Sequence, residues 1–242
     1  MLTLRRFAGL PIRRKLLLLV LLPLAVVLPL LVVLLALWSD AAFSRLLITK
    51  VRSDLAVAHG YFERVLGEVG ASADAMAGSH VLHRLLPENA DLAVSAARAG
   101  EALPRLLADL RRRGQLDFVL LRDAEGRLLA ADRPLSRAAT DGQDRLPPLP
   151  PGGRAGGVMA DLAVLSPQQL AALGPDLAAR ARVRLVPTRN AAPTDRDTED
   201  RALVVLATAP VRDLAGRVRG HLQAGLLLNR NLPFIDHVNE IV

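Results

Sequence analysis

The hydrophobic pattern of the chain begins with an uninterrupted apolar run. Residues 16–38 are 23 consecutive uncharged residues, of which 13 are Leu and five are Val. At about 1.5 Å per residue, a helix of this length reaches roughly 35 Å, which exceeds the ~30 Å hydrocarbon layer of a bilayer. The apolar core of a secretory signal is shorter, at about 7 to 15 residues. The run therefore predicts an uncleaved transmembrane helix.

Charge next to this run predicts its orientation. Residues 1–15 contain five basic residues and no acidic one, whereas the segment just after Trp38 offers only Arg45 and Lys50 alongside Asp40. The positive-inside rule then leaves residues 1–15 in the cytoplasm. Arg is far commoner than Lys in this chain, as is typical of GC-rich bacterial genomes. We expect a single-pass protein of a bacterial inner membrane, with residues 39–242 in the periplasm.

After the run, the pattern becomes helical. Apolar residues recur at spacings of three and four from Phe43 to Met76, which predicts one long amphipathic helix. Its apolar stripe is either part of a core or a dimer seam. A second helical region covers residues 87–113 and ends at Gly114.

The period then changes to two, which is typical of strands. A Pro/Gly-rich loop covers residues 134–157, and a short helix is expected over 167–180. This order predicts an α+β fold with helices packed on an antiparallel sheet of about five strands. The expected strands are 115–122, 127–132, 182–187, 202–211 and 218–228. The expected segments are 1–15 (basic terminus), 16–38 (transmembrane helix), 39–114 (helical region), 115–228 (sheet module) and 229–242 (start of a further helix).

Two expected hairpin turns have nearly the same sequence. One is Arg122-Asp-Ala-Glu-Gly-Arg127 and the other is Arg212-Asp-Leu-Ala-Gly-Arg217. In such turns the Asp side chain accepts hydrogen bonds from backbone amides, and the Gly adopts the left-handed conformation. The repeated sequence indicates turn chemistry rather than a ligand site.

Composition narrows the possible functions. The net charge is +7, but without the five basic residues at the N-terminus 26 basic residues stand against 24 acidic ones. This balance is too even for a nucleic-acid surface. The absence of cysteine excludes disulfides, thiolate catalysis and Cys-based zinc sites. His80, His83 and Glu88 make a weak metal pattern, and no catalytic motif is present. We expect no catalytic residue, no metal and no cofactor.

The polar stretch 188–201, between two expected strands, is the candidate ligand site. Carboxylate recognition needs a guanidinium group together with hydroxyl or amide donors, and this stretch supplies those types. The alternative is a solvated loop with internal ion pairs. The candidate ligand-binding residues are Arg189, Asn190, Thr194 and Arg201, with Arg184 and His221 as weaker candidates on strands.

The arrangement resembles the periplasmic Cache sensor domain, the extracellular relative of PAS, and in particular the double Cache form of bacterial sensor histidine kinases. The resemblance covers residues 39–242 and rests on the long helix and the two hairpins. The segments that carry it are Leu116-Asp-Phe-Val-Leu-Leu-Arg-Asp123, Gly126-Arg-Leu-Leu-Ala130, Ala209-Pro-Val-Arg-Asp213, Gly216-Arg-Val-Arg-Gly220 and Ala224-Gly-Leu-Leu-Leu-Asn229.

The resemblance implies a dimeric receptor for a small periplasmic ligand, often a carboxylate or an amino acid. It implies the sensing region of a two-component sensor histidine kinase, truncated before its output module. The same sensor also fits a chemoreceptor or a cyclic-dinucleotide enzyme. A single-span periplasmic binding or assembly protein without an output domain is the alternative from another class. The expected partners are the ligand, the inner membrane and a second copy of the chain, without nucleic acid.

Overall fold

The computed structural model describes residues 12–87, 90–136, 145–149, 157–186, 188–189, 192 and 194–231. The chain divides into two compact units, Met1–Val57 and Ala58–Val242. Each unit is described by itself. The second unit contains all the strands and every cavity discussed below.

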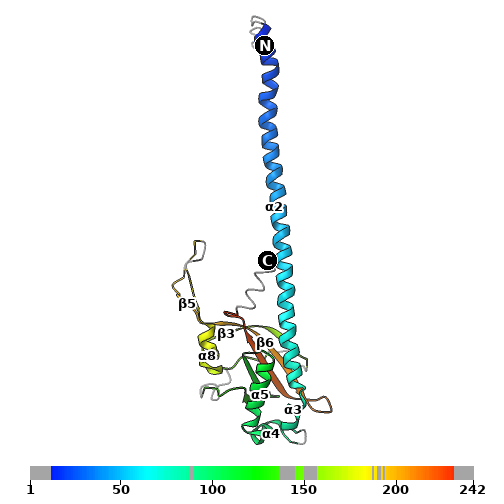
Figure 1. The fold of residues 1–242 in the computed structure, drawn as a ribbon, viewed down its shortest axis with the longest axis vertical. Helices are drawn as coiled ribbons and strands as arrows, with labels where there is room; N and C mark the ends of the chain where they lie inside the picture. Colours follow the sequence, from blue (N-terminus) through cyan, green and yellow to red (C-terminus); the bar gives the residue numbers. More distant parts are fainter. Residues whose placement is uncertain are drawn as a thin grey trace. The chain divides into compact units, whose positions relative to one another are not determined.

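Helix α2 spans Ile12–Ala77, a single helix of 66 residues that contains Pro23 and Pro29 (Figure 1). Among the residues that the structure describes, no helix is long and apolar enough to cross a membrane. The predicted transmembrane helix over 16–38 is therefore wrong, and so is the predicted single-pass localisation in the inner membrane. The apolar run 16–38 is part of the longer helix α2. It does not form a separate helix of its own length, as the count of uncharged residues had suggested.

Three shorter helices follow α2, and the last two of them occupy the second helical region expected over 87–113. They are α3 (His80–Leu85), α4 (Leu92–Ala99) and α5 (Ala102–Arg113). Caps divide them: the Ser79 hydroxyl accepts a hydrogen bond from the Leu82 amide, and the Asp91 carboxylate accepts bonds from the first amides of α4. Gly100, at φ +50°, ends α4.

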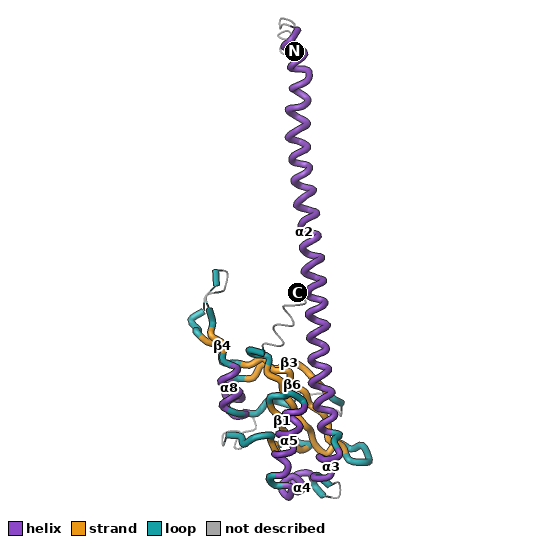
Figure 2. The backbone as a smooth tube through the Cα atoms, viewed as in Figure 1, coloured by secondary structure: helices purple, strands orange, loops and turns teal. Residues whose placement is uncertain are grey.

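The five-stranded antiparallel sheet has the order β2-β1-β7-β6-β3. Figure 2 shows the strands in orange. The α+β class and the strand number are therefore confirmed. The strands are β1 (Phe118–Asp123), β2 (Leu128–Ala131), β3 (Met159–Leu165), β6 (Ala202–Arg212) and β7 (Val218–Leu227).

One expected strand is not in this sheet. The described part of this expected strand, residues 182–186, contributes only β4 (Val183–Arg184), which pairs with β5 (Thr198–Glu199) in a separate two-stranded ribbon. The fifth strand of the sheet is instead β3, which follows the Pro/Gly-rich loop and was not predicted. The expected helix over 167–180 is two helices, α7 (Pro167–Leu173) and α8 (Pro175–Ala181), because Gly174 and Pro175 divide it.

Both predicted hairpin turns are confirmed, and they share one hydrogen-bond pattern. Asp123 Oδ1 accepts from the Arg127 amide at 2.7 Å, and Asp213 Oδ1 accepts from the Arg217 amide at 2.8 Å. In each turn the other Asp oxygen pairs with Nε of the same Arg. The Gly of each turn has a positive φ, +90° at Gly126 and +78° at Gly216.

The sheet lies between two apolar cores. One face packs against α2, α3, α4 and α5 through residues such as Val119, Val205 and Ala224. The opposite face packs against α7, α8 and Leu146 through residues such as Leu120 and Val204. Successive strand residues point to opposite faces, so the cross-strand register assigns every strand side chain to one core or the other.

A buried ion network joins these layers at one edge of the sheet. Asp132, just after β2, accepts a bond from the Val119 amide at 2.9 Å and pairs with Arg111 at 2.9 Å and Arg133 at 3.1 Å. Arg133 also donates to Asp176 of α8 and to the Asp117 carbonyl. The network therefore fixes α5, β1, β2 and α8 relative to one another.

The close approach of β7 to β1 generates a first prediction. A Cβ placed on Gly220 would lie 2.3 Å from the Arg122 carbonyl oxygen, and a backbone atom there cannot move aside cheaply. We expect Gly220→Ala to lower the free energy of unfolding by ~1–3 kcal/mol. Gly60→Ala in α2 is the matched control, because nothing lies within 4 Å of its Cβ. It should raise stability by ~0.5–1 kcal/mol. Urea unfolding of both variants measures this, and equal effects would contradict the described packing.

The buried network generates a second prediction. The Asp132 side chain is 1% exposed, so its removal leaves Arg111 and Arg133 without their shared carboxylate. We expect Asp132→Ala to lower the free energy of unfolding by ~2–4 kcal/mol. Glu101→Ala removes the partner of Arg105 from a pair that is about 80% exposed on both sides, and should change stability by less than ~0.5 kcal/mol. Chemical denaturation compares the two, and a tolerated Asp132→Ala would show that the network is dispensable.

Candidate ligand-binding site

Four polar side chains gather in the middle of the sheet, on the face that packs against α7 and α8. They are Arg122 of β1, His221 and Gln223 of β7, and Thr208 of β6, and we call them the polar cluster. The register places Arg122 opposite His221 and Gln223 opposite Thr208, so all four share one face. Each is at most 4% exposed.

A short segment covers the polar cluster. Residues 145–149, which we call the strap, accept hydrogen bonds through two proline carbonyls. Arg122 Nη2 donates to the Pro147 carbonyl at 2.7 Å, and Gln223 Nε2 donates to the Pro148 carbonyl at 3.0 Å. Leu146 of the strap is buried in the core beside α7. The strap is therefore held both by donors of the cluster and by apolar packing.

Several polar atoms beneath the strap have no hydrogen-bond partner. Among the described residues, these are Nε of Arg122, Oγ1 of Thr208 and Oε1 of Gln223. A buried polar group without a partner costs ~1–3 kcal/mol, and native structures contain few of them. The polar cluster thus offers a free N–H donor, a free carbonyl acceptor and a hydroxyl in one enclosed place.

The charge of Arg122 is also uncompensated within the described part of the chain. Its other bonds go to the carbonyls of Gly126 and Pro147, and no ion pair is formed with a carboxylate there. Burial lowers the pKa of Arg122 to about 10, so the guanidinium remains protonated at neutral pH. A buried cation of this kind favours an anion as its neighbour.

The residues predicted from the sequence lie elsewhere, with one exception. Arg184, Arg189, Thr194 and Arg201 are exposed on or beside the β4–β5 ribbon, and Asn190 lies outside the described residues. His221 alone lies in the polar cluster. Whether the ribbon residues bind a ligand stays a prediction.

The β4–β5 ribbon contains internal ion pairs, as expected if the stretch 188–201 is a solvated loop and not a ligand site. Arg201 donates to both oxygens of Glu199 at 2.9 Å, and Arg196 pairs with the same carboxylate at 3.1 Å. The hydrogen bonds from Arg201 lower the pKa of Glu199 to about 2, so this carboxylate is ionised at neutral pH. The guanidinium of Arg201 is thereby occupied within the ribbon.

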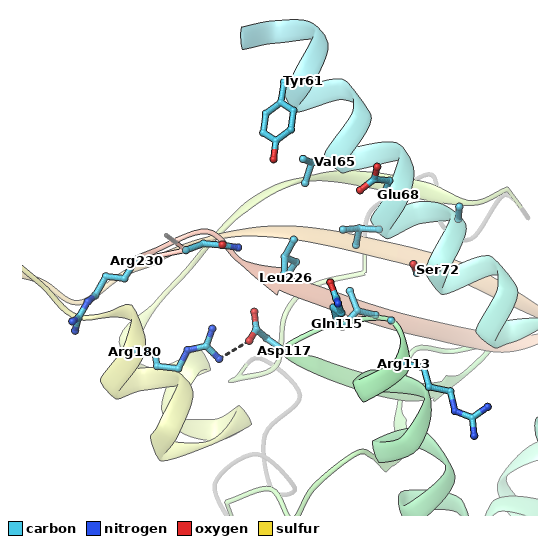
Figure 3. A pocket seen from close by; sticks show the side chains of 15 residues that line it. Tyr61, Val65, Glu68, Ser72, Arg113, Gln115, Asp117, Arg180, Leu226 and Arg230 are labelled. Atoms are coloured by element: carbon cyan, nitrogen blue, oxygen red, sulfur yellow. Dashed lines mark hydrogen bonds and ion pairs between the residues drawn. The ribbon is translucent and has the colours of Figure 1, made fainter. Parts of the chain in front are cut away.

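A separate cavity of about 820 Å³ lies on the other side of the sheet, between α2 and the start of β1 (Figure 3). Tyr61, Glu68 and Ser72 line it from α2, and Gln115 and Asp117 line it from the chain that enters β1. Asp117 accepts a bond from Arg180 of α8 on one oxygen and from the Leu227 amide on the other. This ion pair forms one wall of the cavity.

Sequence reasoning missed Arg122, Thr208 and Gln223, although the sequence contains a signal for them. His221 and Gln223 are two residues apart in an expected strand, and residues at that spacing share one face. Their neighbours across the sheet follow only from the strand order and register, because β1 and β6 are far from each other in sequence.

Comparisons with known proteins add little beyond this geometry. No protein-family model matches the chain, and no curated protein matches it significantly. Among solved structures, the crystal structure of the periplasmic domain of Vibrio cholerae LuxQ matches with a TM-score of 0.40 and 15% sequence identity, covering 78% of this chain and 69% of that one. Function is therefore inferred below from the residues of this chain.

Proposed function

We propose that this chain is the ligand-sensing region of a signal-transduction protein, and that the polar cluster is its ligand site. The observation that carries the proposal is the buried, uncompensated charge of Arg122 beside Gln223 and Thr208. A sheet that needed only a core would carry apolar residues at these positions. Buried polar groups that lower stability are characteristic of binding sites, where a ligand supplies the missing partners.

The polar cluster also suggests the chemistry of the ligand. A carboxylate supplies the acceptor and the negative charge that Arg122 lacks. An ammonium, amide or hydroxyl group on the same molecule supplies a donor to Oε1 of Gln223. A small carboxylate or an amino acid meets both requirements, and the enclosed position favours a small molecule over a macromolecule.

For the output we favour a two-component sensor histidine kinase with a double Cache sensor. The support is the five-stranded antiparallel sheet with helices on both faces, which agrees with the PAS-like arrangement expected from the two hairpins. Signalling would follow from ligand-dependent repacking of α2 on the sheet, because Val65, Val69 and Ala73 of this helix are buried in the sheet's core. A chemoreceptor or a cyclic-dinucleotide enzyme fits the same sensor.

Thr208→Val tests the ligand site with an isosteric change. The hydroxyl is fully buried and has no partner among the described residues, so its removal should raise the stability of the unliganded protein by ~1 kcal/mol. The same change should weaken or abolish the thermal shift produced by the best carboxylate or amino acid in a panel of acetate, succinate and the L-amino acids. Thr198→Val on the ribbon is the control, and should change neither quantity appreciably.

Variants of the β4–β5 ribbon test the alternative ligand site in the same experiment. If the polar cluster binds the ligand, Arg189→Ala and Arg201→Ala keep the full thermal shift. Loss of the shift in these two variants, with retention in Thr208→Val, would instead assign the ligand to the ribbon. Retention in all three would contradict both sites.

We also propose that the protein acts as a homodimer through α2. Every Leu and Val between residues 23 and 35 is exposed on this helix, and contiguous apolar surface of this kind is uncommon on monomers. A second copy of the chain is the partner that the sensor resemblance implies.

The cysteine-free sequence makes this dimer testable. Single cysteines placed from Leu46 to Asp54 should crosslink between copies with helical periodicity, because only the positions facing the partner helix approach each other. Oxidative crosslinking followed by denaturing electrophoresis measures the yield at each position. Uniformly low yields, or yields without a helical period, would argue against α2 as the dimer element.

A further inference from the structure

We propose that the cavity between α2 and the start of β1 binds a neutral polyhydroxylated small molecule, such as a monosaccharide. This site is distinct from the polar cluster. Leu226, which lines the cavity, pairs in register with Val205 and faces the core beneath α2. The polar cluster lies on the opposite face of the same strands.

The charges around the cavity are largely paired with one another. Arg180 and Asp117 form an ion pair in its wall, and Arg113 pairs with Asp109 at 2.8 Å. Figure 3 shows the guanidinium groups of Arg113 and Arg230 directed away from the space between Tyr61 and Asp117. A neutral ligand can bind beside the pair between Arg180 and Asp117 without breaking it.

The groups that remain available both donate and accept hydrogen bonds. Arg180 uses only Nη1 on Asp117, so its other N–H groups are available as donors at the wall. The Gln115 amide offers a donor and an acceptor, and the Glu68 carboxylate, which has no partner among the described residues, offers acceptors. A ligand hydroxyl donates one hydrogen bond and accepts two, so several hydroxyls on one small ring match this mixed set.

The shape and apolar surface of the cavity also fit such a ring. Its volume of about 820 Å³ is within the range of small-molecule pockets. Val65, Val69 and Leu226 provide an apolar wall for the C–H face of a sugar, and Tyr61 adds an aromatic ring whose hydroxyl points towards the cavity (Figure 3).

Backbone conformation places two of the residues that line the cavity. Gln115 (φ +52°) and Arg230 (φ +54°) are the two non-glycine residues with left-handed backbone in the described part of the chain, and both line this cavity. At Gln115 the left-handed backbone is that of a helix C-cap, because the Gln115 and Leu116 amides donate to the Arg112 and Arg111 carbonyls. At Gln115 this backbone follows the end of α5 and places the amide side chain at the cavity.

The single tyrosine of the chain allows a direct test. With ¹³C-labelled tyrosine, the full chain gives ring signals from Tyr61 alone. Titration with D-glucose and with D-ribose should shift these signals saturably for at least one sugar, whereas acetate and trimethylammonium should not. If neither sugar shifts the signals, or if a charged probe does so and the sugars do not, the proposal is overturned.

Matched variants then locate the binding. Glu68→Ala should weaken sugar binding by about fivefold or more, and Ser72→Trp, which fills the cavity from α2, should abolish it. Glu63→Ala changes an exposed carboxylate of the same helix outside the cavity and should leave the affinity unchanged. Thr208→Val should also leave it unchanged, which separates this site from the polar cluster. Sugar binding that survives both Glu68→Ala and Ser72→Trp would overturn the assignment.

Discussion

The buried carboxylate of Asp132 is the interaction on which the second compact unit, Ala58–Val242, depends. It lies at the end of β2 and is shared between the Val119 amide and the guanidinium groups of Arg111 and Arg133. Through Arg133 the same network reaches α8 and the backbone of Asp117. A carboxylate that satisfies three donors fixes the first hairpin against two helical layers, and both candidate sites are built on that hairpin or beside it.

The two faces of the sheet differ in the polarity of their buried side chains. The face beneath α2 carries an almost entirely apolar set of strand residues, whereas the face beneath α7 and α8 accommodates Arg122, His221, Gln223 and Thr208 among its leucines and valines. Polar groups in such a place lower stability unless they are fully satisfied. The domain tolerates them because a complete apolar core on the opposite face, together with the Asp132 network, stabilises the fold.

Local features were predictable from the sequence and long-range ones were not. The hairpin turns followed from Asp, Gly and Arg at fixed spacing, and α2 followed from its apolar stripe. Strand β3 was missed because it follows a Pro/Gly-rich stretch, and 182–187 alternates like a strand yet pairs only in the ribbon. The polar cluster depends on register between distant strands. The transmembrane prediction was wrong because it rested on a count of uncharged residues. Such a count does not give the bounds of the helix that contains them, which here is the 66-residue helix α2.

The strap has a consequence for how strongly any ligand binds beneath it. Pro147 and Pro148 have no N–H group, so at these two positions the backbone can only accept hydrogen bonds, from Arg122 and Gln223. A ligand that accepts from the same donors must displace the carbonyls of the chain itself. If the polar cluster is the ligand site that we propose, the strap acts there as a tethered competitor, present at a fixed effective concentration. Substitutions within the strap would then change the ligand concentration at which the site responds, without altering any residue that touches the ligand.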